Sequence, residues 1–353
     1  MIDTIPARRR SASADAAEAE RQALIAHLEL EQPVETPNNI GYTFYPRDMS
    51  EARRYFRRSL LDWSDAYLAL VDRGLLDRQG DRYLLTPAGA CLAQAFRRAR
   101  PPIYYWYVDF YRAIPRSRAH AALCERLFGR NLGQDGFAEL EHLDTLSDRL
   151  HLRSGDQLLD LGCGGGGIAA YLSETSGARV VGMDYIDEAI RLARRRAARD
   201  ARLAFLVGNL DALPFALRSF DAIVAVDSLY MPNDLAATLR QMRDLLRPGG
   251  RMGLFYSFAL WEDASATAEN LRAEHTPLGA ALRAGGLHFD ALDFTAADYA
   301  HACRKQRIAE ELREEFAAED NLFIYEVQAG TAAGIRHAIE AGQHARYLYL
   351  VNT

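Results

Sequence analysis

A run of glycines in the middle of the chain has the composition of a loop that binds a nucleotide-like ligand. Residues 162–167 read Gly-Cys-Gly-Gly-Gly-Gly, directly after the acid Asp160 and its apolar stretch, and a helical pattern starts near residue 168. Glycine lets the backbone turn sharply and lets a ligand approach closely, while the free N–H groups of a helix start favour an anionic group. Phosphate, pyrophosphate and carboxylate ligands all suit such a loop, so the glycines alone do not identify the ligand.

A second acid, Asp184, ends the next apolar stretch. An acid about twenty residues after a glycine-rich loop can accept hydrogen bonds from both hydroxyls of a ribose. The loop and this acid together predict a ligand that contains a nucleoside. At this point a dinucleotide fits the loop and the acid as well as any other ligand that contains a nucleoside.

Three further segments follow in a fixed order. They are residues 208–215 after a third apolar stretch, 219–230 around a fourth, and 246–252 with Pro248, Gly249 and Gly250. Together with the run from Asp160 to Gly167, this order resembles class I S-adenosylmethionine-dependent methyltransferases over residues 140–353. The resemblance implies a Rossmann-like fold, S-adenosylmethionine as the cofactor and a methyl acceptor that is a small molecule.

The resemblance also implies roles for matched positions at the glycine-rich loop. Gly162, Cys163 and Gly164 would cradle the amino-acid end of the cofactor. Asp160 would contact the ammonium group of the cofactor, directly or through water, and Asp184 would hold its ribose.

The remaining cofactor contacts implied by the resemblance follow later strands. Tyr185 would lie against the adenine, and the turn at Asn209 and Leu210 would read the edge of that ring. The family usually has Asp and Ala at the turn, but Asn209 can still accept a hydrogen bond from the adenine amino group through its side-chain carbonyl. Asp227, at the end of the fourth strand, is also assigned to the cofactor and faces the transfer site.

Aromatic side chains are the candidates for the acceptor side. Tyr230, Tyr256 and Trp261 follow strand ends on one rim, and Tyr105 and Tyr107 lie in an aromatic helix over 103–111. The rings of that helix either pack between two domains or wall the ligand, where a ring face stabilises a sulfonium or ammonium by about 1 kcal/mol. We expect Tyr105 or Tyr107 to touch substrate or cofactor.

The sequence names no catalytic base. A neutral amine needs little beyond alignment, so an amine is one acceptor that fits, whereas a phenol or acidic carbon needs a base or a metal. In plant-type O-methyltransferases a histidine follows the region of the fifth strand. The corresponding residues of this chain, 256–263, contain no histidine. His142 is a substrate-side candidate, although a lone histidine is more often structural. No spacing typical of metal ligands occurs, so we expect no metal.

The elements that must position these residues alternate along the chain. Apolar stretches at 157–161, 179–183, 203–207, 222–226 and 251–257 are separated by helical patterns. This alternation predicts an α/β fold with a doubly wound, mostly parallel sheet, in which ligands bind at the carboxyl ends of the strands. Within the domain at 151–353, a charged helical insert at about 296–344 is predicted to form a lid over a small substrate, or else a plain helical cap.

Three zones precede this core. Residues 1–20 predict a disordered tail because they are rich in Ala, Ser and charge without apolar periodicity. Residues 21–95 read as helices and a short hairpin with a turn at Gly80, which is the order of a winged helix, and residues 96–150 predict a helical connector. The winged-helix-like domain would either bind DNA or pack and dimerise, and dimerisation would make the protein a homodimer.

The composition limits the partners of the protein. A net charge of -6 over 353 residues makes nucleic acid an unfavourable partner. Four scattered cysteines and the lack of a long apolar run predict a cytoplasmic protein without a membrane span. Two alternatives stay open: a methyltransferase for RNA, DNA or protein, and a winged-helix regulator that senses the cofactor.

Overall fold

The computed structural model describes residues 12–32, 48–53, 56, 62–258 and 266–352. These residues fall into two compact units, which divide inside one helix, after Asp109. The division falls within residues 96–150, the predicted helical connector, so that their first part belongs to the N-terminal unit and the remainder to the C-terminal unit. Each unit is described by itself.

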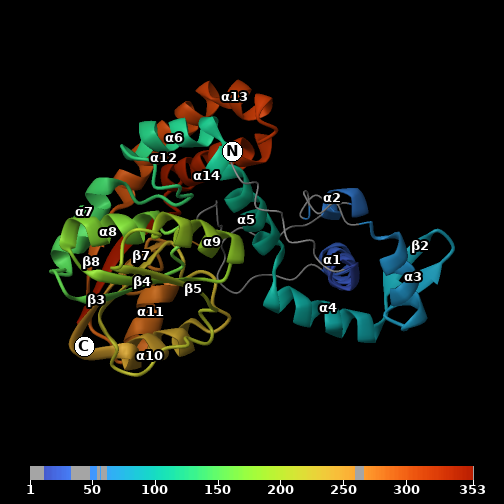
Figure 1. Ribbon diagram of the computed structural model, residues 1–353, viewed down its shortest axis with the longest axis horizontal. Coiled ribbons are helices and arrows are strands. Elements are labelled where there is room, and N and C mark those ends of the chain that lie inside the picture. Colours follow the sequence, from blue (N-terminus) through green and yellow to red (C-terminus); the bar gives the residue numbers. More distant parts are fainter. Residues whose placement is uncertain (1–11, 33–47, 54–55, 57–61, 259–265, 353) are drawn as a thin grey trace. The chain divides into compact units, whose positions relative to one another are not determined.

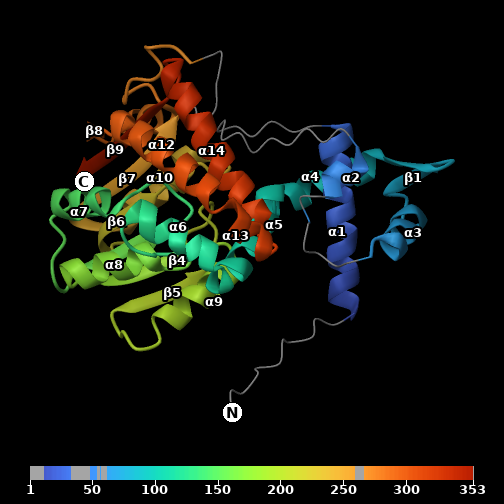
Figure 2. The same ribbon diagram turned by 90° about the horizontal axis from the view of Figure 1, so that it is seen from above.

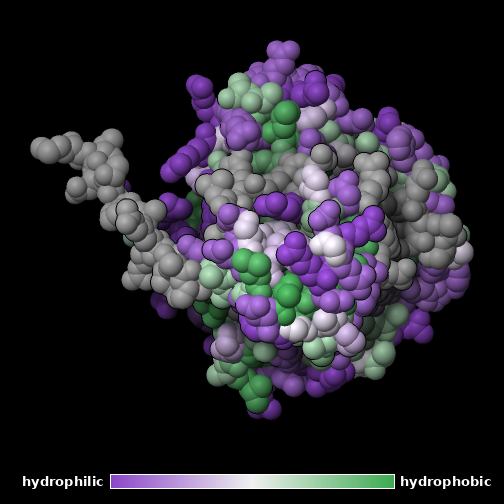
Figure 3. All heavy atoms as spheres, turned by 90° about the vertical axis from the view of Figure 1, so that its right-hand side faces the viewer, coloured by the Kyte–Doolittle hydropathy of each residue, from purple (hydrophilic) through white to green (hydrophobic). Residues whose placement is uncertain are grey.

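The N-terminal unit is mainly helical. Its elements are α1 (Ala12–Glu31), α2 (Met49–Arg53), α3 (Ser64–Asp72), β1 (Leu76–Gln79), β2 (Arg82–Leu85), α4 (Pro87–Ala99) and the start of α5 (Pro102–Ala113). The central helix α1 packs against α3 and α4, and it buries Leu24, Ile25 and Leu28. One face of the molecule shows mostly hydrophilic residues and only small groups of hydrophobic ones (Figure 3).

The start of α1 differs from the tail predicted over residues 1–20. The helix is formed from Ala12 onward, and Glu18 and Ala19 are already buried within it. Alanine has the highest intrinsic helix propensity, so an alanine-rich stretch continues a helix whose later turns are packed. Residues 1–11 lie outside the described part of the chain.

The hairpin predicted for this unit is present. Strands β1 and β2 pair antiparallel from Leu76 opposite Leu85 to Gln79 opposite Arg82, and Gly80 turns with a φ of 64°. Thr86 then caps α4, because its side chain accepts a hydrogen bond from the N–H of Gly89. The order of helices and hairpin is that of the winged-helix prediction, which itself stays a prediction.

The C-terminal unit is built on a seven-stranded sheet in the order β5-β4-β3-β6-β7-β9-β8. The strands are β3 (Gln157–Leu161), β4 (Arg179–Asp184), β5 (Leu203–Val207), β6 (Phe220–Val226), β7 (Leu246–Phe258), β8 (Phe289–Asp293) and β9 (Ala345–Asn352). Neighbours from β5 to β7 are parallel, whereas β9 runs antiparallel to both β7 and β8. The predicted doubly wound, mostly parallel sheet is confirmed.

Helices cover both faces of this sheet (Figure 1). One face carries α7 (Leu140–Arg149), α8 (Gly167–Ser176) and α9 (Asp187–Arg196), and the other carries α10 (Leu235–Leu245) and α11 (Pro277–Ala284). The middle strands are apolar on both sides, as a sheet covered on both faces requires: Leu158, Leu159, Ile223 and Val224 are fully buried.

The insert between β8 and β9 is helical. It consists of α12 (Thr295–Glu311), α13 (Arg313–Ala318) and α14 (Leu322–Glu340). Helix α12 packs along α14 and against α6 (Arg118–Phe128), which follows the short helix Ile114–Arg116 (Figure 2). Among the helices of the described ranges, none is both long enough and apolar enough to cross a membrane.

Two helical glycines provide a test of packing. A Cβ atom at Gly167, the first residue of α8, would lie 1.9 Å from the carbonyl oxygen of Leu132, whereas a Cβ atom at Gly330 in α14 would meet nothing within 4 Å. We expect Gly167→Ala to lower the free energy of unfolding by about 1–3 kcal/mol, since the backbone at Leu132 must move. Gly330→Ala should be neutral or raise it by up to about 1 kcal/mol. Urea unfolding measures both, and equal effects would contradict the described contact.

Candidate functional site

The glycine-rich loop leaves the carboxyl end of β3 and is tied to the neighbouring strand β4. The backbone N–H groups of Gly162 and Cys163 both donate to the carbonyl oxygen of Met183, at 2.8 and 3.1 Å. Gly162, Gly164 and Gly166 have φ angles of 76°, 54° and 73°. Glycine adopts this left-handed conformation without the strain that a Cβ atom brings, which explains the composition of the loop.

Asp184 lies directly against this loop, as the sequence predicted. Its carboxylate accepts hydrogen bonds from the N–H of Gly164 and the N–H of Ile186, each at 2.9 Å. Burial raises the pKa of Asp184 to about 6, although these backbone hydrogen bonds act in the opposite direction. The carbonyl oxygen of Asp184 also accepts from the N–H of Gly208 at 3.0 Å, which brings the turn after β5 to the same place.

Asp160 is a buried acid whose second oxygen has no hydrogen-bond partner. The side chain lies at the end of β3 and is 2% exposed, and Oδ2 contacts no donor among the described residues. Burial and then the charge of Asp184 raise the pKa of Asp160 to about 7. A buried polar atom without a partner is costly, so its presence beside a ligand-type loop indicates that a ligand supplies the missing donor.

Two side chains, Ser228 and Tyr111, lie so close to Gly162 and Gly164 of the loop that a Cβ atom at either glycine would clash with them. A Cβ atom at Gly162 would lie 2.3 Å from Cβ of Ser228, and one at Gly164 would lie 2.4 Å from the hydroxyl of Tyr111. Tyr111 is in the last turn of α5, and burial beside Asp184 raises its pKa well above the usual value. Its contact with the loop was not predicted from the sequence.

Tyr105 and Tyr107 are in the same helix but belong to the N-terminal unit. The ring of Tyr105 is buried and packs edge-on against Phe56 at 4.8 Å, and Tyr107 packs edge-on against Trp106 at 5.0 Å. Their predicted contact with substrate or cofactor stays a prediction. Tyr111 is one helical turn after Tyr107, so helical spacing could have added it to the candidates.

The turn after β5 is held by its own side chains. Oδ1 of Asn209 accepts from the N–H of Asp211 at 3.0 Å, and the carbonyl of Leu210 accepts from the hydroxyl of Thr238 at 3.1 Å. Tyr185 follows Asp184 and is half-buried. The structure therefore gathers the predicted adenine-side residues around the end of β4, through the bond of Gly208 to Asp184.

Asp227 is engaged by protein partners on both carboxylate oxygens. It has a φ of 54° and pairs with the guanidinium of Arg346 through two contacts of 2.6 and 3.0 Å. It also accepts from the N–H of Phe137 at 3.1 Å. Arg346 is fully buried on β9, and the charge of Asp227 holds the pKa of this arginine above its usual value. Asp227 thus joins the end of β6 to β9 and to the segment before α7.

Two of the three aromatic candidates on the strand-end rim, Tyr230 and Tyr256, lie within the described residues. Tyr230 and Tyr256 are buried with ring centroids 4.7 Å apart, and the hydroxyl of Tyr230 accepts from the N–H of Ser257 at 2.6 Å. They brace the carboxyl ends of β6 and β7, beside Ser228. Trp261 lies outside the described residues.

His142 lies at the start of α7, and its predicted contact with the substrate stays a prediction. Its Nδ1 accepts from the N–H of Glu139 at 3.3 Å, and its ring packs edge-on against Phe294 at 4.8 Å. Burial and the charge of Arg346 lower its pKa. Within the described residues, no group of three His, Cys, Asp or Glu side chains could hold a metal ion.

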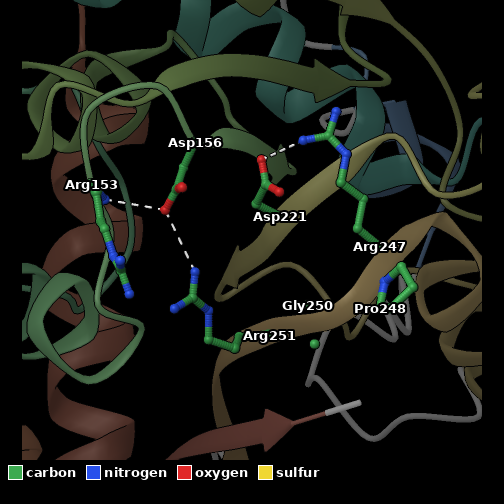
Figure 4. Close-up of a pocket in the computed structure, with 8 residues that line it drawn as sticks. Arg153, Asp156, Asp221, Arg247, Pro248, Gly250 and Arg251 are labelled. Carbon is green, nitrogen blue, oxygen red and sulfur yellow. Dashed lines mark hydrogen bonds and ion pairs between the residues drawn. The ribbon is translucent and has the colours of Figure 1, made fainter.

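A separate pocket of about 270 Å³ lies at the other end of the sheet, where the parallel strands begin (Figure 4). Arg247 donates to Asp221 at 2.6 Å, and Arg251 donates to Asp156 at 3.5 Å. Ligands of such sheets bind at the carboxyl ends of the strands, so this pocket is not part of the candidate site. Its ion pairs join the starts of β3, β6 and β7.

A family model described as a methyltransferase domain matches residues 158–250. The matched stretch includes the glycine-rich loop, Asp184, the turn at Asn209 and Asp227. Residues 158–250 are a methyltransferase domain.

Curated relatives match the chain around this methyltransferase domain. The 27-O-demethylrifamycin SV methyltransferase of Amycolatopsis mediterranei is 36% identical over 148 residues, which are 38% of this chain and 54% of that protein. Phosphoethanolamine N-methyltransferase 1 of Triticum aestivum is 32% identical over 129 residues, which are 36% of this chain and 26% of that protein. The chain therefore spans about half or less of the length of these relatives.

Solved structures share the fold. A phosphoethanolamine N-methyltransferase of Haemonchus contortus, in complex with phosphomonomethylethanolamine and S-adenosylhomocysteine, has a TM-score of 0.57 at 17% identity and covers 70% of this chain and 60% of its own. The cyclopropane synthase MmaA2 of Mycobacterium tuberculosis has a TM-score of 0.56 at 14% identity and covers 70% of this chain and 98% of its own. The class I S-adenosylmethionine-dependent methyltransferase fold predicted from the sequence is confirmed.

The raised pKa of Asp160 in the methyltransferase domain predicts a pH-dependent stability. At pH 4 the carboxyl is protonated in the folded state and about half ionised in the unfolded state, so only a small part of the effect is present. As the pH rises toward the folded-state pKa of about 7, the unfolded state ionises first, and the folded state loses up to about 4 kcal/mol of stability. Asp160→Asn cannot ionise, so it should match the wild type at pH 4 and exceed its free energy of unfolding at pH 8.

Urea unfolding at both pH values measures this difference. Asp148→Asn, which changes an exposed acid of α7, is the matched control and should follow the wild-type profile. Parallel profiles for Asp160→Asn and the wild type would show that the buried carboxyl does not carry the assigned proton.

Proposed function

We propose that the protein transfers a methyl group from S-adenosylmethionine to a small-molecule acceptor. The observation that carries this proposal is the joint arrangement of the glycine-rich loop with Asp160 and Asp184. The loop supplies close backbone approach, and the two acids supply one oxygen without a partner and one carboxylate at the strand end. A nucleoside that also carries an amino acid matches these groups.

The residues fit the cofactor group by group. The oxygen of Asp160 that lacks a partner suits the ammonium of the amino-acid end, and Gly162, Cys163 and Gly164 line that end. Asp184 already accepts two backbone hydrogen bonds, but a carboxylate has about four acceptor sites and can accept ribose hydroxyls as well. Tyr185, Asn209 and Leu210 would border the adenine.

The bound cofactor would supply the electrophilic methyl carbon of its sulfonium. The protein then has to align the acceptor with this carbon and exclude water. Asp227 contributes by fixing the backbone of the segment before α7, through the N–H of Phe137, rather than by a free carboxylate. Tyr111 closes the loop from above, since its hydroxyl lies against Gly164.

Three observations support a small acceptor from metabolism or natural-product biosynthesis. The chain carries a net charge of -6, which disfavours a nucleic acid. The helical insert packs on α6 and on β9, the strand whose Arg346 pairs with Asp227, so the insert lies at the end of the sheet that carries the loop. The names of the curated relatives state small molecules, a rifamycin and phosphoethanolamine.

Two substitutions test cofactor binding. Asp184→Ala removes the carboxylate that meets the loop, and Gly162→Val forces a side chain into Ser228 at a φ of 76°. Each should weaken S-adenosylhomocysteine binding by roughly a hundredfold or more, measured by calorimetry. Asp290→Ala on the edge strand β8 and Gly330→Val on the surface of α14 are matched controls. Wild-type affinity in either site variant would reject the assignment of the loop.

Tyr111 and Tyr107 can be compared within one helix. Tyr111→Ala removes a ring that touches Gly164 and Gly165, so we expect about a tenfold loss of S-adenosylhomocysteine affinity, while Tyr111→Phe keeps most of it. Tyr107→Ala is the comparison one turn earlier. A loss confined to Tyr107→Ala would restore the earlier residue as the cofactor contact and remove Tyr111 from the site.

A further inference from the structure

Lys305 is the single lysine of the chain. The sequence contains 42 lysine and arginine residues, and every other one is arginine. Lys305 lies on α12 of the helical insert and is 1% exposed. The insert therefore places the one lysine of the chain in the protein interior.

The ammonium of Lys305 has no ionic partner among the described residues. Nζ donates to the carbonyl oxygen of Asp135 at 3.3 Å and lies 4.5 Å from the ring centroid of Phe137, and no described carboxylate oxygen is within 4.0 Å. The nearby carboxylates are held by other groups: Asp135 by Gln328, Asp227 by Arg346 and Asp298 by His344.

An ammonium without a counter-charge in the protein interior lowers the stability of the fold unless a ligand pairs with it. Moving it out of water costs several kcal/mol, and a carbonyl and a ring face offset only part of that cost. Its neighbours on the buried side of α12, Ala302, Ile308 and Ala309, show that apolar residues serve the packing there. One of the three ammonium N–H groups donates to Asp135 in the described contacts, so two donors are left for a ligand.

The ammonium contacts a segment that packs against Asp227. Asp135 and Phe137 belong to the stretch between α6 and α7, and a Cβ atom at Gly136 would lie 2.9 Å from Oδ2 of Asp227. Asp227 is followed by Ser228, which covers Gly162. The charge of Asp135 also contributes to the raised pKa of Tyr111, after burial and the charge of Asp184.

We propose that Lys305 binds an anionic oxygen of the methyl acceptor, so that the substrate carries a carboxylate, phenolate or enolate near the methyl-accepting atom. This inference rests on the proposed function and names the substrate class for the same site. A compact ammonium with free donors suits one oxygen atom, whereas the planar guanidinium of arginine is larger and makes forked contacts. An amine acceptor without such an oxygen does not satisfy this site.

The charged and titratable groups whose charges act on Lys305 come from α6, from α12 and from the segments that follow α6 and β6. They are His120 and Cys124 of α6, Asp135 of the following segment, Asp227 after β6, and Asp298 and His301 of α12. Burial lowers the pKa of Lys305, and the acidic groups act in the opposite direction. An anion bound to the ammonium adds to the second effect, so it should raise the pKa of Lys305.

The single lysine makes a direct test possible. Biosynthetic incorporation of lysine labelled with carbon-13 at the ε position gives a signal that belongs to Lys305 alone, in the full-length folded protein. With S-adenosylhomocysteine bound, benzoate should shift this signal and bind about tenfold more tightly than benzamide or benzylamine, and it should raise the lysine pKa. Benzamide and benzylamine match benzoate in shape without its negative charge.

The outcomes separate the two proposals. Failure of S-adenosylhomocysteine to bind the wild type would overturn the proposed function. Normal S-adenosylhomocysteine binding with no response to benzoate, or with an equal response to all three probes, would overturn the role of Lys305. Lys305→Met should keep S-adenosylhomocysteine affinity and lose the preference for benzoate, while Arg307→Met on the exposed side of α12 keeps both.

Discussion

The carboxyl end of β4 fixes the geometry of the whole site. The carbonyl of Met183 accepts two N–H groups of the glycine-rich loop, and the carboxylate of Asp184 accepts a third from Gly164. These bonds set the path of the loop between β3 and α8. Because Gly208 also donates to Asp184, the turn after β5 is located by the same residue. One strand end thus positions all groups that would border a nucleoside.

A second interaction extends this frame to the helical insert. Arg346 of β9 forms an ion pair with Asp227, and Asp227 also accepts a hydrogen bond from the backbone N–H of Phe137. This buried pair joins the end of β6, the segment before α7 and the strand that follows the insert. Breaking one partner of such a pair would leave an uncompensated buried charge, so the three parts are strongly coupled.

The sequence predicted best what depends on local patterns. Strands at 157–161 and 203–207 coincide with β3 and β5, since short apolar runs between glycines and polar turns have few other solutions. Asp184 followed from its distance to the loop. Tyr111 was missed because aromatic residues cover nearly every face of α5, and only its position one turn after the candidate Tyr107 pointed to it. The pair of Asp227 with Arg346 joins residues 119 positions apart, which no local pattern reveals. Lys305 carried a signal in composition alone, as the one lysine among arginines.

Some buried charges of the C-terminal unit have partners of opposite sign, such as Arg346 with Asp227, whereas Asp160 and Lys305 have none among the described residues. Asp160 keeps an oxygen without a donor, and Lys305 keeps an ammonium without a carboxylate, within the part of the chain that the structure describes. Both groups lower the stability of the protein without ligands, and a ligand group of opposite charge would remove this cost. Asp160 suits the cationic end of a cofactor and Lys305 suits an anion. The two sites therefore favour ligand groups of opposite charge, so binding of the cofactor at Asp160 leaves Lys305 to bind an acceptor.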